Sequence, residues 1–227
     1  MAIAPKQMTR PMLATRRLIL EPLRPRHARD VYGAIEESRA SLGRWLPFVH
    51  TTRSASETEA FIRRVARSEC DIVWGVWLRD EENGPRGGWF GPRRPQRYCG
   101  NVGMHRVFVE QATGEVGYWV RRSREGQGII TEAVAAVLLW AFGPLNLERL
   151  AIEAATGNAA SLRVVEKLGF VREGVLREAQ RIPGRRARLD LVISGLVRSD
   201  FAQARHTFAR YCGTARPWEG RNEASSA

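Results

Sequence analysis

Two glycines one residue apart, Gly126 and Gly128, stand between a run of arginines and an apolar segment. Glycine lets the main chain come close to a ligand, and the first N–H groups of a helix have no partner within it. A helix that begins here presents backbone donors and partial positive charge, which suits a phosphate group. Arg121, Arg122 and Arg124 add full charges around the turn. The alternative is a tight strand-to-helix turn with a solvated basic rim.

The glycine pair does not match two common nucleotide-binding motifs. The dinucleotide fingerprint Gly-x-Gly-x-x-Gly needs a third glycine where this chain has Thr131. A P-loop needs Gly-Lys-Ser/Thr, and the sequence contains no Gly-Lys pair. The turn could therefore hold a phosphate group, but in neither of these two ways.

A strand and a helix must position this turn. Residues 115–120 mix β-branched and aromatic side chains, which is typical of a half-buried strand. Residues 129–142 carry apolar side chains at helical spacing, so we expect an amphipathic helix packed on that strand. A second strand over 150–154 is followed by a turn at 156–162 that leads into another helix. The order strand, turn and helix thus occurs twice.

Three motifs in these units resemble the GNAT superfamily of acetyl-CoA-dependent N-acetyltransferases. They are Gly117-Tyr118-Trp119 ahead of the glycine pair, Asn158-x-x-Ser161, and Val165-Glu166-Lys167-Leu168-Gly169-Phe170. Residues 15–23 and 42–48 are similar to the RimJ/RimL branch, whose named members acetylate ribosomal-protein N-termini. The resemblance extends over residues 13–201. It implies an α+β, three-layer GNAT fold, with a mixed, mostly antiparallel central sheet of about seven strands, splayed at its centre and flanked by helices.

The resemblance also implies acetyl-CoA as co-substrate, no metal, and a set of CoA-binding positions. Main-chain N–H groups of residues 124–129 would hold the pyrophosphate, and an N–H group within 118–120 would stabilise the tetrahedral oxyanion. The splayed strands would pair with the pantetheine arm. The expected CoA-binding residues are Tyr118, Trp119, Val120, Arg124, Glu125, Gly126, Gln127, Gly128, Ile129, Ile130, Asn158 and Ser161.

Two residues of the second helix have alternative roles. Ser161 matches the residue that lies near the CoA sulfur in the family, which makes it the candidate general acid. It could equally be an ordinary first-turn hydroxyl. Asn158 matches the side chain that binds pantetheine, and its position fits a helix N-cap equally well.

The general base remains open among three residues. Glu115 lies in the central strand, but a shift of one residue decides which face it occupies. The RimL branch has a glutamate where this chain carries Gln180, which cannot take a proton, and Glu178 on the same strand face is a weaker substitute. His105 is a further candidate or a structural histidine. A protein N-terminal amine, with a reference pKa near about 8 against about 10.4 for lysine, needs little base strength.

The composition is strongly basic. Lys and Arg number 36 against 24 Asp and Glu, for a net charge of +12, which attracts polyanions and acidic protein partners or simply reflects an Arg-rich genome. The absence of zinc-finger spacing, a helix-turn-helix pattern and an RNP-like strand argues against nucleic acid. Cys70, Cys99 and Cys212 offer neither a disulfide framework nor metal-ligand spacing. With no long apolar run or signal segment, we expect a cytoplasmic protein.

The chain length of 227 residues suits one domain. We expect a flexible lead over 1–12, a GNAT domain over 13–204, and a disordered tail over 205–227, where we find no periodicity. Residues 80–97 form a Gly/Pro/Arg-rich insertion where the family usually has a tight hairpin.

Two further features concern the first helices of this domain. The spacing of Ser56 and Glu59 predicts a capping box for a helix that runs to about Glu69. Trp45 either forms a wall of the acceptor cleft, as in the family, or plugs the core.

The leading hypothesis is an N-acetyltransferase in which a primary amine attacks the thioester of acetyl-CoA directly. A protein or peptide N-terminal amine is the first choice of acceptor. One alternative is a small amine, such as an aminoglycoside or a polyamine. Another is a non-catalytic CoA-sensing or nucleic-acid-binding module built on a degenerate transferase. The acceptor, the acyl length and the choice between monomer and homodimer are not decided by the sequence.

Overall fold

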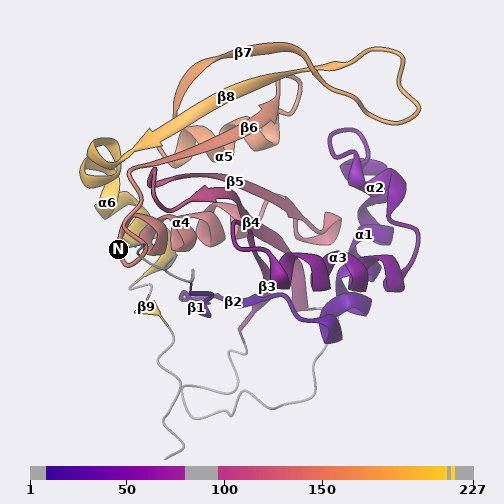
Figure 1. The fold of residues 1–227 in the computed structure, drawn as a ribbon, viewed down its shortest axis with the longest axis horizontal. Helices are drawn as coiled ribbons and strands as arrows, with labels where there is room; N and C mark the ends of the chain where they lie inside the picture. Colours follow the sequence, from indigo (N-terminus) through magenta and orange to yellow (C-terminus); the bar gives the residue numbers. More distant parts are fainter. Residues whose placement is uncertain (1–8, 80–96, 214–215, 218–227) are drawn as a thin grey trace, which may run out of the picture.

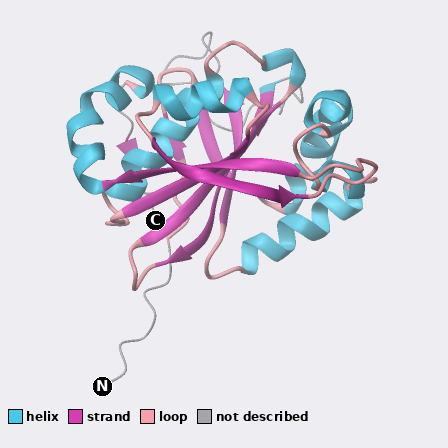
Figure 2. Cartoon of the chain, turned by 90° about the horizontal axis from the view of Figure 1, so that it is seen from above, coloured by secondary structure: helices cyan, strands magenta, loops and turns pink. Residues whose placement is uncertain are grey.

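The structure is a computed structural model that describes residues 9–79, 97–213 and 216–217. Within these ranges the chain forms one open sheet of nine strands in the order β7-β8-β6-β5-β4-β3-β2-β1-β9. Helices flank both faces (Figures 1 and 2). Strands β1 and β9 have only two residues each, and the seven longer strands agree with the expected number. The expected α+β fold with a mixed sheet is confirmed.

The strands are β1 (Leu13–Ala14), β2 (Leu18–Pro22), β3 (Ile72–Leu78), β4 (Tyr98–Phe108), β5 (Thr113–Val120), β6 (Arg149–Ala155), β7 (Val171–Gln180), β8 (Leu189–Val197) and β9 (Arg216–Pro217). The helices are η1 (Pro25–His27), α1 (Ala28–Leu42), α2 (Phe48–Thr51), α3 (Ala55–Arg67), η3 (Arg122–Arg124), α4 (Ile129–Phe142), α5 (Ala159–Lys167) and α6 (Arg198–Cys212).

The sheet is splayed between β5 and β6. These two strands are parallel and pair only from Thr113–Arg149 to Glu115–Ala151. Beyond that point β5 continues to Val120 along β4, whereas β6 continues along β8. The expected opening at the centre of the sheet is therefore present, and residues 116–120 have no strand partner on the β6 side within the described chain.

Helix α4 is covered on nearly every side, although we expected an amphipathic helix. Each of its residues except Leu139 is buried. It packs on β4 and β5, and α6 lies against it (Figure 1). A helix that is apolar all round can be stable in water only if other elements cover it.

Helix α6, which covers α4, extends into the segment that we expected to be a disordered tail from residue 205. Residues 205–212 form the second half of α6 and belong to the domain. Phe201 and Phe208, seven residues apart, share one helix face and stack, with ring centroids 5.3 Å apart. Phe201 also stacks on Phe142 of α4 at 4.6 Å. The remainder of the expected tail, at 214–215 and 218–227, lies outside the described residues, as do positions 1–8 of the lead and 80–96 of the insertion.

Helix α3 also begins earlier than its sequence suggested. Its N-cap is Ser54, whose Oγ accepts a hydrogen bond from Glu57 N at 3.1 Å. Glu57 reaches back to accept one from Arg53 N at 2.5 Å. Both Ser54–Glu57 and Ser56–Glu59 have the spacing of a capping box. The structure uses the first pair, and Glu59 instead accepts from Arg63 Nε at 3.0 Å one turn later.

The described ranges lack two kinds of feature, a helix that could span a membrane and a cluster of metal ligands. No helix there has the length and apolar character needed to cross a bilayer. In the same ranges, no group of three or more His, Cys, Asp or Glu side chains is arranged to hold a metal ion.

Candidate active site

The open side of β5 presents main-chain donors. Arg121 N donates to Cys99 O of β4 at 2.7 Å, so the N–H group of Arg121 faces β4. Main-chain groups alternate in direction along a strand. The N–H group of Val116 also faces β6 and belongs to the last pairing of the ladder, whereas those of Tyr118 and Val120 point toward the gap beyond it. They are the donors that the sequence placed at the end of this strand.

The turn after β5 leads into the N-terminus of α4. Gly126 and Gly128 have φ values of 72° and 73°, the left-handed conformation that glycine adopts without cost. A Cβ atom at Gly126 would meet nothing within 4 Å, and one at Gly128 would meet only Arg17 Nη2 at 3.7 Å. Arg17 is thus the one described side chain, apart from those of the chain neighbours, within 4 Å of either Cβ position. The first N–H groups of α4, beginning at Ile129, complete a set of backbone donors beside it.

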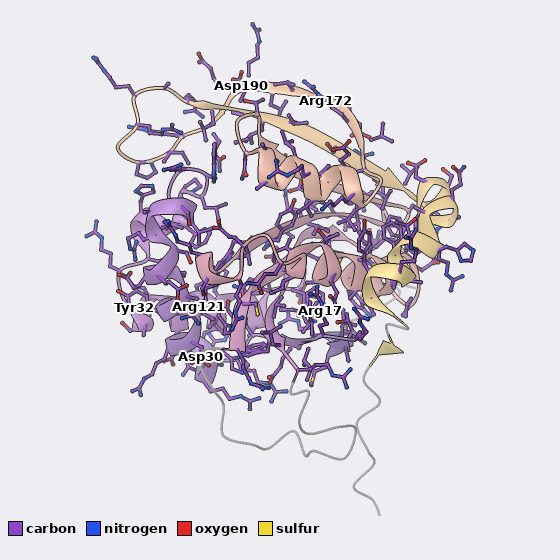
Figure 3. All side chains as sticks on the ribbon, turned by 180° about the vertical axis from the view of Figure 1, so that it is seen from behind. Arg17, Asp30, Tyr32, Arg121, Arg172 and Asp190 are labelled. Carbon is purple, nitrogen blue, oxygen red and sulfur yellow. The ribbon has the colours of Figure 1, made fainter. Side chains whose placement is uncertain are left out.

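Arg17, which is labelled in Figure 3 and was not among the predicted site residues, contacts this turn. Its Nη1 donates to Gln127 O at 3.2 Å, and its Nε donates to Glu132 Oε2 at 2.6 Å. Glu132 is buried in the first turn of α4 and also accepts from Thr15 Oγ1 at 2.5 Å. A carboxylate within an apolar helix needs a cationic partner. That requirement is the signal from which Arg17 or a similar residue could have been expected.

Helix α1 holds the loop that precedes the glycines. Arg122 N donates to Ser38 Oγ at 2.9 Å, and Ser123 N donates to Glu37 Oε1 at 3.1 Å. Arg121 Nε donates to Glu37 Oε2 at 2.5 Å, so this arginine is tied to α1. Desolvation raises the pKa of Glu37, but the hydrogen bonds from Ser123 and Arg121 outweigh it and leave that pKa below its ordinary value. The carboxylate therefore stays ionised and holds the loop.

Tyr118 and Ser161 meet beside the gap. Their hydroxyl oxygens lie 2.9 Å apart, and Tyr118 also donates to Ser161 O at 3.2 Å. Burial raises the pKa of Tyr118 to about 12, which keeps this phenol protonated near neutral pH. Asn158 Oδ1 accepts from Ser161 N at 3.2 Å, so Asn158 is the N-cap of α5. A contact of Asn158 with pantetheine stays a prediction.

The other predicted CoA-binding residues fall into two groups. The side chains of Trp119, Ile129 and Ile130 are buried in the core, so only their main chain can face a ligand. Those of Glu125 and Gln127 belong to exposed residues of the turn. Val120 and Arg124 lie between these groups, at the end of β5 and in η3. The structure thus brings the predicted positions together around the turn and the gap, mainly through backbone groups.

The two predicted glutamate bases lie apart. Glu115 is at the point where β5 and β6 part, and its carboxylate accepts a hydrogen bond from Arg106. Glu178 is on β7, separated from β5 in the sheet order by β8 and β6. Its N–H donates to Asp190 Oδ1 at 2.7 Å, on the hairpin at the top of Figure 3, and the residue is exposed. The structure therefore does not join Glu178 to Glu115.

Trp45 borders the turn between β6 and α5. A Cβ atom at Gly157 would lie 3.3 Å from the Trp45 ring. The residue is half-buried, so it does not act as a core plug. Arg185, in the connection between β7 and β8, donates from Nη1 to Arg44 O at 3.4 Å. The segment after α1 and the β7–β8 connection thus approach each other, as Figure 1 shows.

Comparisons with known proteins agree with this geometry. The family model described as an acetyltransferase (GNAT) domain matches residues 17–171. A Bacillus subtilis protein named "Putative ribosomal N-acetyltransferase YdaF" is 31% identical over 79% of this chain and 90% of its own length. A ribosomal-protein-serine acetyltransferase of Escherichia coli is 33% identical over 36% of this chain and 45% of its own length.

Solved structures show a similar fold. Mycobacterium smegmatis RimJ, in complex with a CoA disulfide, matches with a TM-score of 0.74 and 21% identity, over 92% of this chain and 99% of that protein. The ribosomal L7/L12 acetyltransferase RimL, in complex with coenzyme A, matches with a TM-score of 0.70 and 16% identity, over 81% of this chain and 96% of that protein.

Proposed function

Because this chain belongs to the GNAT acetyltransferase family, in its RimJ/RimL branch, we propose that it transfers the acetyl group of acetyl-CoA to the N-terminal amine of a protein. The amine attacks the thioester directly, and the products are an N-acetylated protein and CoA. The chain is an N-acetyltransferase because it belongs to this family. Our proposal concerns the acetyl donor and the amine acceptor.

One observation supports acetyl-CoA as the acetyl donor. The gap between β5 and β6 opens toward the end of β5, where the glycine turn presents backbone N–H groups at the start of α4, and Tyr118 of β5 meets Ser161 of α5 beside it. The space at Gly126 is open, and a diphosphate would accept hydrogen bonds from such donors. Arg17 adds a fixed positive charge 3.7 Å from the Cβ position of Gly128. Residues 124–129 would hold the pyrophosphate, and the free edge of β5 would pair with pantetheine.

The chain supplies two further functions to the reaction. The N–H group of Tyr118 or Val120 on the open edge of β5 would stabilise the oxyanion that forms on the thioester carbonyl. The Tyr118 hydroxyl, kept protonated by burial, can donate to Ser161 Oγ. That arrangement would free the Ser161 proton for the thiolate that leaves, so Ser161 is the proposed general acid.

The comparisons and the charge support a protein acceptor. The Escherichia coli relative is named as a ribosomal-protein-serine acetyltransferase, and RimL as an α-N-protein acetyltransferase of ribosomal L7/L12. The net charge of +12 favours an acidic partner through electrostatic steering. An amine of a ribosomal protein would place the reaction in the cytoplasm.

The test is release of CoA thiol from acetyl-CoA with a panel of acceptors. The panel contains peptides with free N-termini, acidic and neutral, and matched peptides with formylated N-termini. Spermidine and an aminoglycoside complete it. We expect thiol release, and a mass increase of one acetyl group, only with free N-termini. Turnover of the small amines alone would support the alternative acceptor class, and CoA binding without turnover of any acceptor would support a CoA sensor.

A further inference from the structure

The imidazole of His105 lies over a pair of glycines at the splayed part of the sheet. Gly103 of β4 and Gly117 of β5 are directly opposite each other. A Cβ atom at Gly103 would come within 2.6 Å of His105 Nε2, and one at Gly117 would lie 3.7 Å from the same nitrogen. Gly117 is two residues beyond Glu115, where β5 leaves β6. Nε2 is therefore held against the strand segment whose free edge faces the gap.

Asp71 determines which nitrogen of His105 can take a proton. Its Oδ1 lies 3.2 Å from His105 Nδ1, and its Oδ2 accepts from Ser68 Oγ at 2.8 Å. Burial raises the pKa of Asp71, but hydrogen bonds from Ser68 and His105 lower it overall, so the carboxylate is ionised near neutral pH. An ionised carboxylate only accepts hydrogen bonds, so Nδ1 carries the hydrogen. The lone pair of the neutral imidazole is then on Nε2.

The imidazole of His105 is partly exposed to solvent. The His105 side chain is 40% exposed, and with Asp71 it lines a cavity of about 360 Å³ beside the C-terminal half of α3. The charged groups around the imidazole are Arg64 and Arg67 of α3, Asp71 before β3, and Arg106 with Glu115 on β4 and β5. The Glu115 carboxylate accepts a hydrogen bond from Arg106, whereas His105 Nε2 accepts none from a described arginine or lysine.

We propose that His105 is the proton acceptor for the attacking amine and that Asp71 is its positioning residue. This inference rests on the proposed acetyl transfer. The amine nitrogen bonds to the thioester carbon, the carbon–sulfur bond breaks, and one amine proton passes to Nε2 and then to water. The thiolate takes a proton from Ser161 on α5, on the other side of the gap, and Ser161 regains a proton from water. Proton removal and proton delivery then use different groups, and charge is balanced over the cycle.

The direct test compares His105→Gln with the wild type, using the peptide acceptor found by thiol release. A positioned general base contributes about 10²- to 10⁴-fold, so kcat at pH 7 should fall at least about 100-fold. The Kd of CoA, measured by calorimetry, should not change, and the melting temperature should fall no further than in Asp71→Asn. The defect should shrink as the pH rises past about 8, where the N-terminal amine loses its proton unaided. Asp71→Asn should lower kcat less and change the pH profile in the same direction.

A second pair of variants displaces the imidazole without removing it. Gly103→Ala places a methyl group 2.6 Å from the Nε2 position and should reproduce much of the loss in kcat. Gly174→Ala on β7, where a Cβ atom meets nothing within 4 Å, is the matched strand control and should keep the wild-type rate.

The outcomes separate this inference from the proposed function. An active wild type with an equally active His105→Gln, and the same pH profile, overturns the role of His105 alone. Failure of the wild type to acetylate any amine overturns both.

Discussion

Gly128→Ala tests the phosphate-binding turn with the smallest possible change. The new methyl group meets only Arg17 Nη2 at 3.7 Å, an ordinary contact, so steric overlap contributes nothing. The cost comes from φ of 73°, because a residue with a Cβ atom in the left-handed region loses about 1–2 kcal/mol. For a chain of this size that corresponds to a melting temperature lower by about 2–8 °C.

The effect on CoA should be larger than the effect on stability. If the backbone relaxes toward negative φ, an N–H group turns away from the proposed diphosphate. A hydrogen bond to a charged group contributes about 1.5–3 kcal/mol. The Kd of CoA should therefore rise about 10- to 150-fold, which isothermal calorimetry measures directly.

Gly169→Ala is the matched control for this experiment. Gly169 has φ of 72°, and a Cβ atom there would meet only the Ala204 methyl group at 3.9 Å. It ends α5 and takes no part in the turn before α4. Both variants should lose similar stability, and only Gly128→Ala should lose CoA affinity. Equal CoA affinity in the two variants would refute the assignment of residues 124–129 to the diphosphate.

Three further predictions concern the acid, the C-terminal helix and pH. Ser161→Ala should lower kcat by about 100-fold, and Tyr118→Phe by about 3- to 10-fold, both with little change in CoA affinity; unchanged steady-state rates would remove the pair from the reaction. Phe208→Ala, at a fully buried side chain, should cost about 3–5 kcal/mol in urea unfolding, and a cost below about 1 kcal/mol would contradict the packing of α6 on α4. Because the folded-state pKa of Asp71 is lowered, its ionisation contributes stability above the ordinary aspartate value of about 3.9, and this contribution is lost as the pH falls through the folded-state pKa. The stability difference between wild type and Asp71→Asn should thus be present at pH 7 and shrink in acid; a pH-independent difference would contradict it.

Local patterns were sufficient for much of the fold. The expected strand at 115–120 lies within β5, Thr113–Val120, and the expected helix at 129–142 has the observed bounds. Side-chain type and periodicity report such elements because each is built from neighbours in the chain. The turn at Gly126 and Gly128 was visible for the same reason, since left-handed backbone conformations favour glycine.

Two features of the fold differ from those expected from the sequence, the extent of α6 and the N-cap of α3. The spacing of Phe201 and Phe208 was present, and an all-apolar α4 required a cover, yet the segment after residue 204 was expected to be disordered. The two Ser-x-x-Glu pairs at the start of α3 were equally good by spacing. In the folded chain Ser54 Oγ accepts a hydrogen bond from Glu57 N, whereas Glu59 pairs with Arg63, so the first pair caps the helix.

The sequence by itself determined the family, the order of the elements and the glycine turn, because these depend on residue type and short-range spacing. The tertiary structure decided which distant side chains meet: Arg17 with Glu132, Tyr118 with Ser161, and His105 with Asp71. Such contacts follow from strand register and from the packing of helices on the sheet. Because a shift of one residue moves a strand's side chains to the opposite face, chemistry that depends on those faces is defined only once the chain is folded.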